Sequence, residues 1–186
     1  PEYTGGIGLS GAAALETFVR NGGTLVAFNN ACQLPVQLFG LPVRFSIGRP
    51  VSSESGEDAG TAGAYYSPGS ILRITTNPAH PIAFGMPKEA YAFQNGGQAW
   101  DITLLPDFNH GDRALTPIAK YETEHVLASG WLSGERLVAG KNVLIEARLG
   151  QGRVVLFGFR PQFRGQSFGT FRLILNALYL SSAKPV

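Results

Sequence analysis

Apolar residues recur along the first third of the chain at spacings that predict a helix and then a strand. In residues 10–22, Leu15, Phe18 and Val19 fall on one face of a helix, and glycine follows its last turn. A continuous apolar run occupies 24–28, as is typical of a strand covered on both faces. We therefore expect this strand to lie inside a sheet.

A second helical pattern covers 31–40, so helix, buried strand and helix follow one another, which is the α/β order. Shorter strands are expected further along, at 71–76, 90–93, 100–104 and 115–121. Residues 48–68 are rich in Gly, Ser and acidic residues, and we expect them to form a long surface loop.

The strongest β pattern lies near the end of the chain. Residues 142–159 hold two apolar strands joined at Gly150-Gln151-Gly152, where glycine tolerates the positive φ of a tight turn, so we predict an antiparallel hairpin. A final helix is predicted at 167–180. Its apolar side chains recur every three or four positions and are expected to close the fold: Phe168, Phe171, Leu175 and Leu178.

Composition supports one folded domain, 1–186, of mixed α/β class. The chain has 186 residues, of which 44% are hydrophobic and 15% charged, which excludes a disordered protein. The 15 Lys and Arg residues are scattered and the net charge is only +2, so a nucleic-acid partner is not expected. No apolar run reaches the roughly 18 residues that a membrane helix needs, so a membrane partner is not expected either.

Two groups of polar side chains follow the first and the last apolar strands. Asn29 and Asn30 come after one strand, and Arg160, Gln162 and Arg164 come after the other. Ligand sites of α/β sheets form where strands end, so we expect the two groups to converge. The arginines could then bind a carboxylate or phosphate, and the amides could orient a peptide or sugar. Alternatively, these groups hydrogen-bond one another and hold the site shut.

Other candidate chemistry is weaker. Cys32 is the single thiol, and a hydrolase with Cys32 as nucleophile would need His80 or His125 as its base. Neither these histidines nor His110 forms a close pair with a carboxylate, so no metal site is expected. GIGLSG (6–11) matches a dinucleotide-binding turn but lacks the preceding strand, so no cofactor is expected.

TLVAFNNACQLPVQLFG (24–40) resembles the strand, elbow and helix of class I glutamine amidotransferases, which carry G-x-C-x-G-x-Q there. In that alignment Asn29 takes the place of the nucleophile. The family's F-H-P-E corresponds to FRPQ (159–162), with Arg160 for His and Gln162 for Glu. The resemblance implies a three-layer, flavodoxin-like fold with a mostly parallel sheet and a C-terminal antiparallel hairpin. It also implies no glutaminase chemistry, since an amide is no nucleophile and a guanidinium is no base.

Over nearly its whole length the chain looks like the amidotransferase-like domain that follows the catalytic domain of bacterial M14-type zinc carboxypeptidase-like proteins. Three stretches carry this resemblance: YTGGIGLSGAAALETFVRNGGTLVAF (3–28), YYSPGSILRITTNPAHPIAFGMP (65–87) and SGWLSGERLVAGKNVLIEARLGQGRVVLFGFRPQFRGQSFGTFRLILNALYL (129–180). It implies a C-terminal piece of a larger, periplasmic or extracellular protein, in which the upstream peptidase-like domain is the partner.

From this resemblance we expect a non-catalytic accessory domain. Its degenerate site would bind a small anionic or peptide ligand or a partner domain. Assembly into a homo-oligomer is a further alternative that the sequence leaves open. Amidotransferase-like sheets have a strand before the first helix, which this chain lacks. Either the sheet keeps an exposed edge there, or another chain or another part of the parent completes it.

Overall fold

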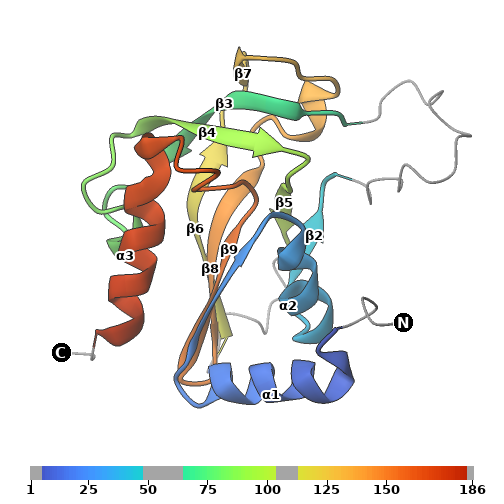
Figure 1. The fold of residues 1–186 in the computed structure, drawn as a ribbon, viewed down its shortest axis with the longest axis vertical. Coiled ribbons are helices and arrows are strands. Elements are labelled where there is room, and N and C mark those ends of the chain that lie inside the picture. The colour runs from blue at the N-terminus through green and yellow to red at the C-terminus, as the bar shows by residue number, and fades with distance from the viewer. Residues whose placement is uncertain (1–5, 48–64, 104–112, 184–186) are drawn as a thin grey trace, which may run out of the picture.

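The computed structural model describes residues 6–47, 65–103 and 113–183 (Figure 1). These residues form one nine-stranded sheet and three α-helices. The helices are α1 (Gly8–Arg20), α2 (Gln33–Leu38) and α3 (Phe171–Ser182). The strands are β1 (Thr24–Phe28), β2 (Val43–Phe45), β3 (Pro68–Thr76), β4 (Glu89–Asn95), β5 (Trp100–Ile102), β6 (Arg113–Tyr121), β7 (Leu127–Ser129), β8 (Asn142–Leu149) and β9 (Gly152–Phe157). Short 3₁₀ helices are η1 (Asn29–Cys32), η2 (Pro81–Ala83), η3 (Glu135–Leu137) and η4 (Phe168–Thr170).

The main path of the sheet runs β1-β9-β8-β6-β3-β4, with β2, β5 and β7 paired at its sides. Only β1 and β9 run parallel, whereas every other pair in the described sheet is antiparallel. The predicted mostly parallel sheet is therefore wrong. Parallel neighbours need a crossover of a dozen or more residues, usually a helix, and the described α-helices all lie before β2 or after β9.

Helices cover both faces of the sheet, as Figure 1 shows. In β9 the side chains alternate: Val154 and Leu156 join the core under α1 and α2, while Val155 and Phe157 join the core under α3. The continuous apolar run of this strand is thus explained by burial on both sides. β1 lies at the edge of the sheet, and β9 is its only strand partner among the described residues.

The predicted hairpin of β8 and β9 is confirmed, with Leu149 opposite Gly152. Gly150 has φ +62°, the left-handed conformation that the turn requires. A β-carbon on Gly152 would lie 2.0 Å from the carbonyl oxygen of Val19 and 2.2 Å from that of Gly23. Glycine at this position therefore allows the end of α1 to approach the hairpin.

The prediction of which side chains of the last helix pack inward is wrong. Phe168, Leu175 and Leu178 are 76%, 48% and 52% exposed, whereas Leu173 and Ala177 are buried against the sheet. α3 is apolar around most of its circumference, so periodicity alone could not select the face that packs.

Other differences from the sequence predictions are local. α1 begins two residues before Ser10, and η1 precedes a short α2 where one helix was predicted. The short strands β2 and β7 were not predicted. Most of the predicted loop, residues 48–64, lies outside the described residues, as does His110. No helix within the described ranges is long and apolar enough to cross a membrane.

Candidate functional site

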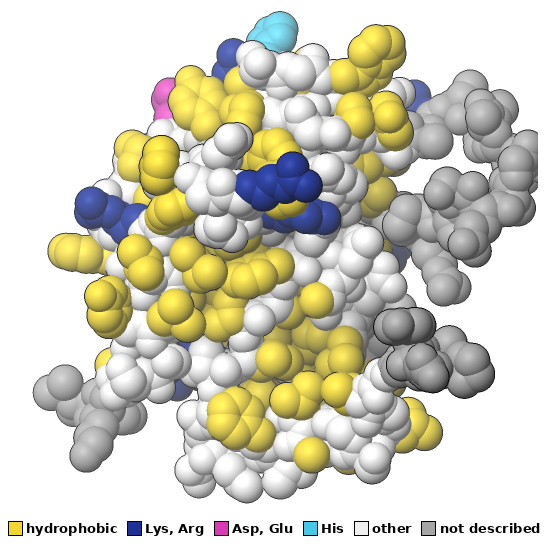
Figure 2. All heavy atoms as spheres, in the orientation of Figure 1, with side chains coloured by type: hydrophobic (Ala, Val, Ile, Leu, Met, Phe, Trp, Pro, Cys, Tyr) yellow, Lys and Arg dark blue, Asp and Glu magenta, His cyan; other side chains and the backbone are white. Residues whose placement is uncertain are grey.

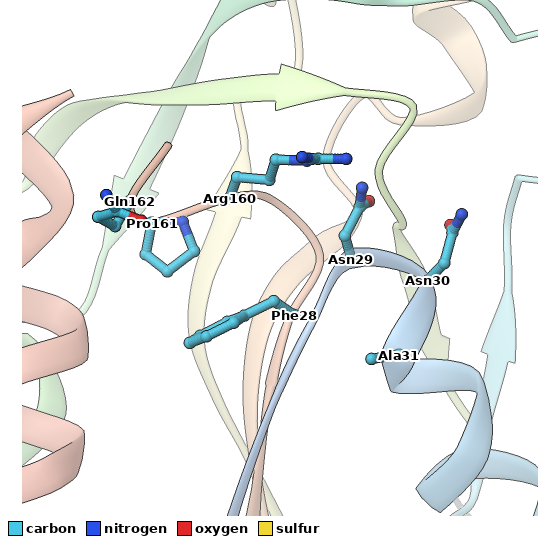
Figure 3. Close-up of a pocket in the computed structure, with 7 residues that line it drawn as sticks. All are labelled: Phe28, Asn29, Asn30, Ala31, Arg160, Pro161 and Gln162. Atoms are coloured by element: carbon cyan, nitrogen blue, oxygen red, sulfur yellow. The ribbon is translucent and has the colours of Figure 1, made fainter. Parts of the chain in front are cut away.

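The candidate site lies where the parallel strands β1 and β9 end. Phe28 and Phe157, the last residues of the two strands, are paired in register, so the segments that follow them leave the same edge of the sheet. A pocket of about 310 Å³ opens there (Figure 3). It is lined by Phe28, Asn29, Asn30, Ala31, Arg160, Pro161 and Gln162. Four of the five predicted site residues therefore line one pocket, although about 130 positions separate the two segments.

Asn29 occupies the sharp bend between β1 and η1. Its φ is +52°, a left-handed conformation that asparagine tolerates better than most residues. Its Nδ2 donates a hydrogen bond of 3.0 Å to the carbonyl oxygen of Asn95. Its Oδ1 is buried and has no hydrogen-bond partner in the described part of the chain. Asn29 thus lines the pocket with a side chain that is held in place and keeps one buried acceptor unpaired.

Asn30 is exposed and ties the pocket to the loop that follows β4. Its Oδ1 accepts a hydrogen bond of 2.9 Å from Nε2 of the buried Gln98. The Gln98 backbone N–H donates in turn to the carbonyl oxygen of Gly158, at 2.6 Å. A β-carbon on Gly158 would lie 2.3 Å from the Gln98 carbonyl oxygen, so only glycine permits this approach. The loop at 95–98 is therefore the support behind the pocket.

Arg160 supplies the positive charge of the pocket. Its backbone N–H donates to the carbonyl oxygen of Phe93 at 3.3 Å, and its guanidinium carbon lies 5.0 Å from the centre of the Phe163 ring. Phe163 stacks on Phe93 with 5.1 Å between ring centres. The Arg160 Nε is buried and has no hydrogen-bond partner among the described residues. An aromatic pair thus holds the side chain while a donor stays unused.

The fifth predicted residue, Arg164, lies beside the pocket rather than in its lining. Its guanidinium carbon is 5.3 Å from the centre of the same Phe163 ring, and the side chain is exposed. The described residues that line the pocket include no acidic side chain. Figure 2 shows a small group of basic side chains on this face, surrounded by apolar and uncharged ones. The local charge therefore favours an anion.

Cys32 does not lie in the pocket. It is fully buried in η1, and its thiol donates to the carbonyl oxygens of Ala27 and Phe157, both at 3.3 Å. Burial raises the pKa of the Cys32 thiol far above its ordinary value. His80 is engaged elsewhere, with Nε2 3.0 Å from Oε2 of the buried Glu146. This geometry counts against a reactive thiolate.

The loop at 95–98 was not predicted to be part of the site. Its pattern QNGGQ, two glycines flanked by amides, could have suggested a tight turn that presents polar side chains. For metal ions, the described residues contain no group of three or more His, Cys, Asp or Glu side chains that could hold one.

No family model and no curated protein matches the sequence, but solved structures match its fold. A protein described as a GMP synthase subunit from Thermoplasma acidophilum matches with a TM-score of 0.51 and 13% identity, over 93% of this chain and 65% of that chain. A ThuA-like protein from Parabacteroides merdae matches with a TM-score of 0.52 and 14% identity, over 96% and 68%. The chain has a glutamine amidotransferase-like fold.

Identities this low show the fold alone. The chain also matches a β-galactosidase from Bacillus circulans, with a TM-score of 0.51 and 13% identity, over 95% of this chain and 21% of that chain. It spans only 65% of the Thermoplasma protein. The comparisons thus place a similar domain in proteins that are longer than this chain.

Proposed function

We propose that this domain is a non-catalytic module that binds a carboxylate-bearing small molecule or peptide end in the pocket between β1 and β9. One observation carries the proposal: the pocket is lined by Arg160 and Asn29, and each keeps one buried polar atom, the donor Nε and the acceptor Oδ1, unpaired among the described residues. Unpaired buried polar groups each cost about 1–3 kcal/mol, and a ligand that pairs them recovers this free energy. The matching ligand has a carboxylate for Arg160 and a nearby N–H for Asn29.

The residue types at the bend support the proposal that the module is non-catalytic. Asn29 occupies the position that the amidotransferase resemblance assigns to the nucleophile, and its amide cannot attack a carbonyl. Arg160 occupies the position of the base and stays protonated at neutral pH. Cys32 is fully buried and does not line the pocket, so no described lining residue offers a nucleophile there.

The proposed parent protein rests on the sequence resemblance to domains of M14-type zinc carboxypeptidase-like proteins. We propose that the parent is an exported M14-type zinc carboxypeptidase-like protein and that this domain accompanies its upstream peptidase-like domain. The β-galactosidase match supports an accessory role, because a similar domain makes up about a fifth of that enzyme. A module that binds carboxyl ends would suit a peptidase that acts on them.

The proposal is tested by calorimetric titration with N-acetylglycine, which carries a carboxylate and one N–H. Arg160→Gln removes the charge-assisted hydrogen bonds and should weaken binding roughly 10- to 100-fold. Arg164→Gln is the matched control, because Arg164 contacts the same Phe163 ring without lining the pocket, and it should change affinity less than about threefold.

Two ligand analogues separate the two contacts. The methyl ester of N-acetylglycine lacks the charge that Arg160 would bind, and acetate lacks the N–H that Asn29 would accept. Both should bind more weakly than N-acetylglycine. Equal affinities for acid and ester, or equal losses in the Arg160 and Arg164 variants, would show that the pocket does not recognise a carboxylate.

A further inference from the structure

The outer face of α3 carries large apolar side chains that nothing in the described chain covers. Leu175, Leu178 and Tyr179 are exposed on α3, Phe168 is exposed on η4 just before it, and Phe84, 72% exposed, stands beside the helix. Figure 2 shows a cluster of apolar side chains on this side of the molecule. We infer that the chain forms a two-fold dimer in which this outer face packs against α3 of a second copy, with the two helices antiparallel.

The outer face is held in place before any partner arrives. The Asn176 Nδ2 donates to the carbonyl oxygens of Ile82 and Phe84, both at 3.0 Å, so the corner at 81–84 is fixed to α3. A shallow hollow of about 430 Å³ lies between Phe84 and Tyr179. A surface with a fixed ridge and hollow loses little conformational freedom on association.

The position of the single charged residue, Arg172, favours a second copy of the chain as the partner, with the two helices antiparallel. Arg172 is the only charged residue in 168–183. If Leu175 meets its own copy at the two-fold axis, Arg172 of each chain lies opposite Leu178 and Tyr179 of the other. The arginine can then stack on the tyrosine ring. The two arginines stay apart by six residues, or about 9 Å along the helices. A parallel pair would instead place them face to face.

The apolar area suits a modest dimer. Phe84, Phe168 and Tyr179 are each about three-quarters exposed. Because a fully exposed aromatic side chain presents about 150–250 Å², the three together offer roughly 300–550 Å² of apolar surface. Leu175 and Leu178 enlarge this patch. A stable interface buries about 800 Å² per partner, so the outer face can supply most of one side. A face with one charge would give little affinity to a strongly charged partner.

Sedimentation equilibrium from about 5 to 200 μM tests the inference. The chain should approach twice its mass of 19.8 kDa as concentration rises. Leu175→Glu buries a carboxylate at the axis and should abolish the dimer across this range. Leu9→Glu is the matched control, because Leu9 is 82% exposed on α1, and it should dimerise like the wild type. Far-ultraviolet circular dichroism and thermal melting confirm that both variants are folded.

A cross-linking variant tests the antiparallel geometry. Helices 8–10 Å apart with Cα radii of about 2.3 Å bring facing Cα atoms to roughly 3.5–5.5 Å at the axis, within or near the range of a disulfide. Oxidised Leu175→Cys should therefore give a covalent dimer, whereas Leu9→Cys should not; Cys32 is buried in both. A monomer at every concentration, a dimer that survives Leu175→Glu, or a Leu175→Cys dimer that forms no disulfide on oxidation would overturn the inference.

Discussion

Glu146 is a buried carboxylate with three partners in the described part of the chain, so its substitution gives a quantitative prediction. Its Oε2 lies 3.0 Å from His80 Nε2, and its Oε1 lies 3.4 Å from Arg153 Nη1 and 3.9 Å from Arg148 Nε. The His80 Nδ1 accepts a hydrogen bond from the Ile82 N–H, so Nε2 carries the proton that Glu146 binds. Glu146 therefore joins β8 to the corner below α3.

Glu146→Gln keeps an acceptor for His80 but removes the negative charge. Charge-assisted hydrogen bonds contribute about 1.5–3 kcal/mol, so the free energy of unfolding at pH 7 should fall by about that amount. For a domain of this size each kcal/mol corresponds to about 2–4 °C in melting temperature, which gives a decrease of about 3–12 °C.

The difference should depend on pH. Burial alone would raise the pKa of Glu146, but the hydrogen bond from His80 and the charges of Arg153 and Arg148 outweigh it and hold this pKa below its ordinary value. A carboxylate with a lowered pKa stabilises the fold above its unfolded pKa, about 4.3, and this stabilisation is lost as the pH falls through the folded pKa. The difference between wild type and Glu146→Gln should therefore shrink as the pH falls below about 4.3.

Urea unfolding at pH 7, 5, 4 and 3 measures both effects. Glu16→Gln is the control, because Glu16 makes an ion pair with Arg20 within α1 and is only partly buried, so it should cost less than about 0.5 kcal/mol. A Glu146→Gln variant as stable as the wild type at pH 7, or a difference that widens on acidification, would refute the assignment of Glu146 as a stabilising buried anion.

The remaining predictions concern the residues around the bend. Cys32 should resist iodoacetamide at neutral pH in the folded protein and react only after unfolding, as followed by mass spectrometry; rapid alkylation would support the hydrolase that was the alternative prediction. Asn29→Ala should lower the free energy of unfolding by about 1–3 kcal/mol, since it loses the bond to Asn95 and keeps a β-carbon at positive φ. Asn29→Gly should lower the free energy of unfolding by about 1 kcal/mol less than Asn29→Ala, because glycine adopts positive φ without strain. A glycine variant less stable than the alanine variant would mean that the bend is not left-handed.

The sequence located the pocket better than it predicted the sheet around it. Asn29 and Arg160 could be placed together because each follows a continuous apolar run, and such runs mark buried strands whose polar ends gather at one edge. The convergence holds because β1 and β9 are the parallel pair. The other strands run antiparallel because the described segments between them contain no helical crossover, which the resemblance to a mostly parallel fold does not reveal.

Other features depend on distant contacts that local pattern does not encode. The support of Asn30 by Gln98 joins residues 68 positions apart. The inner face of α3 is chosen by its fit to the sheet, since Leu175 and Leu173 are equally apolar and only the latter is buried. Whether the pocket residues bind a ligand, and whether the parent is a peptidase, stay predictions.

The central claim is that Arg160 and Asn29 together bind a carboxylate-bearing ligand. It is tested most directly by following the arginine Nε–H resonances in ¹H–¹⁵N spectra during titration with N-acetylglycine. We predict a saturable shift of the Arg160 Nε–H resonance and almost none for Arg164, accompanied by a shift of the Asn29 side-chain amide. An unmoved Arg160 resonance at saturating ligand, or equal shifts of both arginines, would contradict the account.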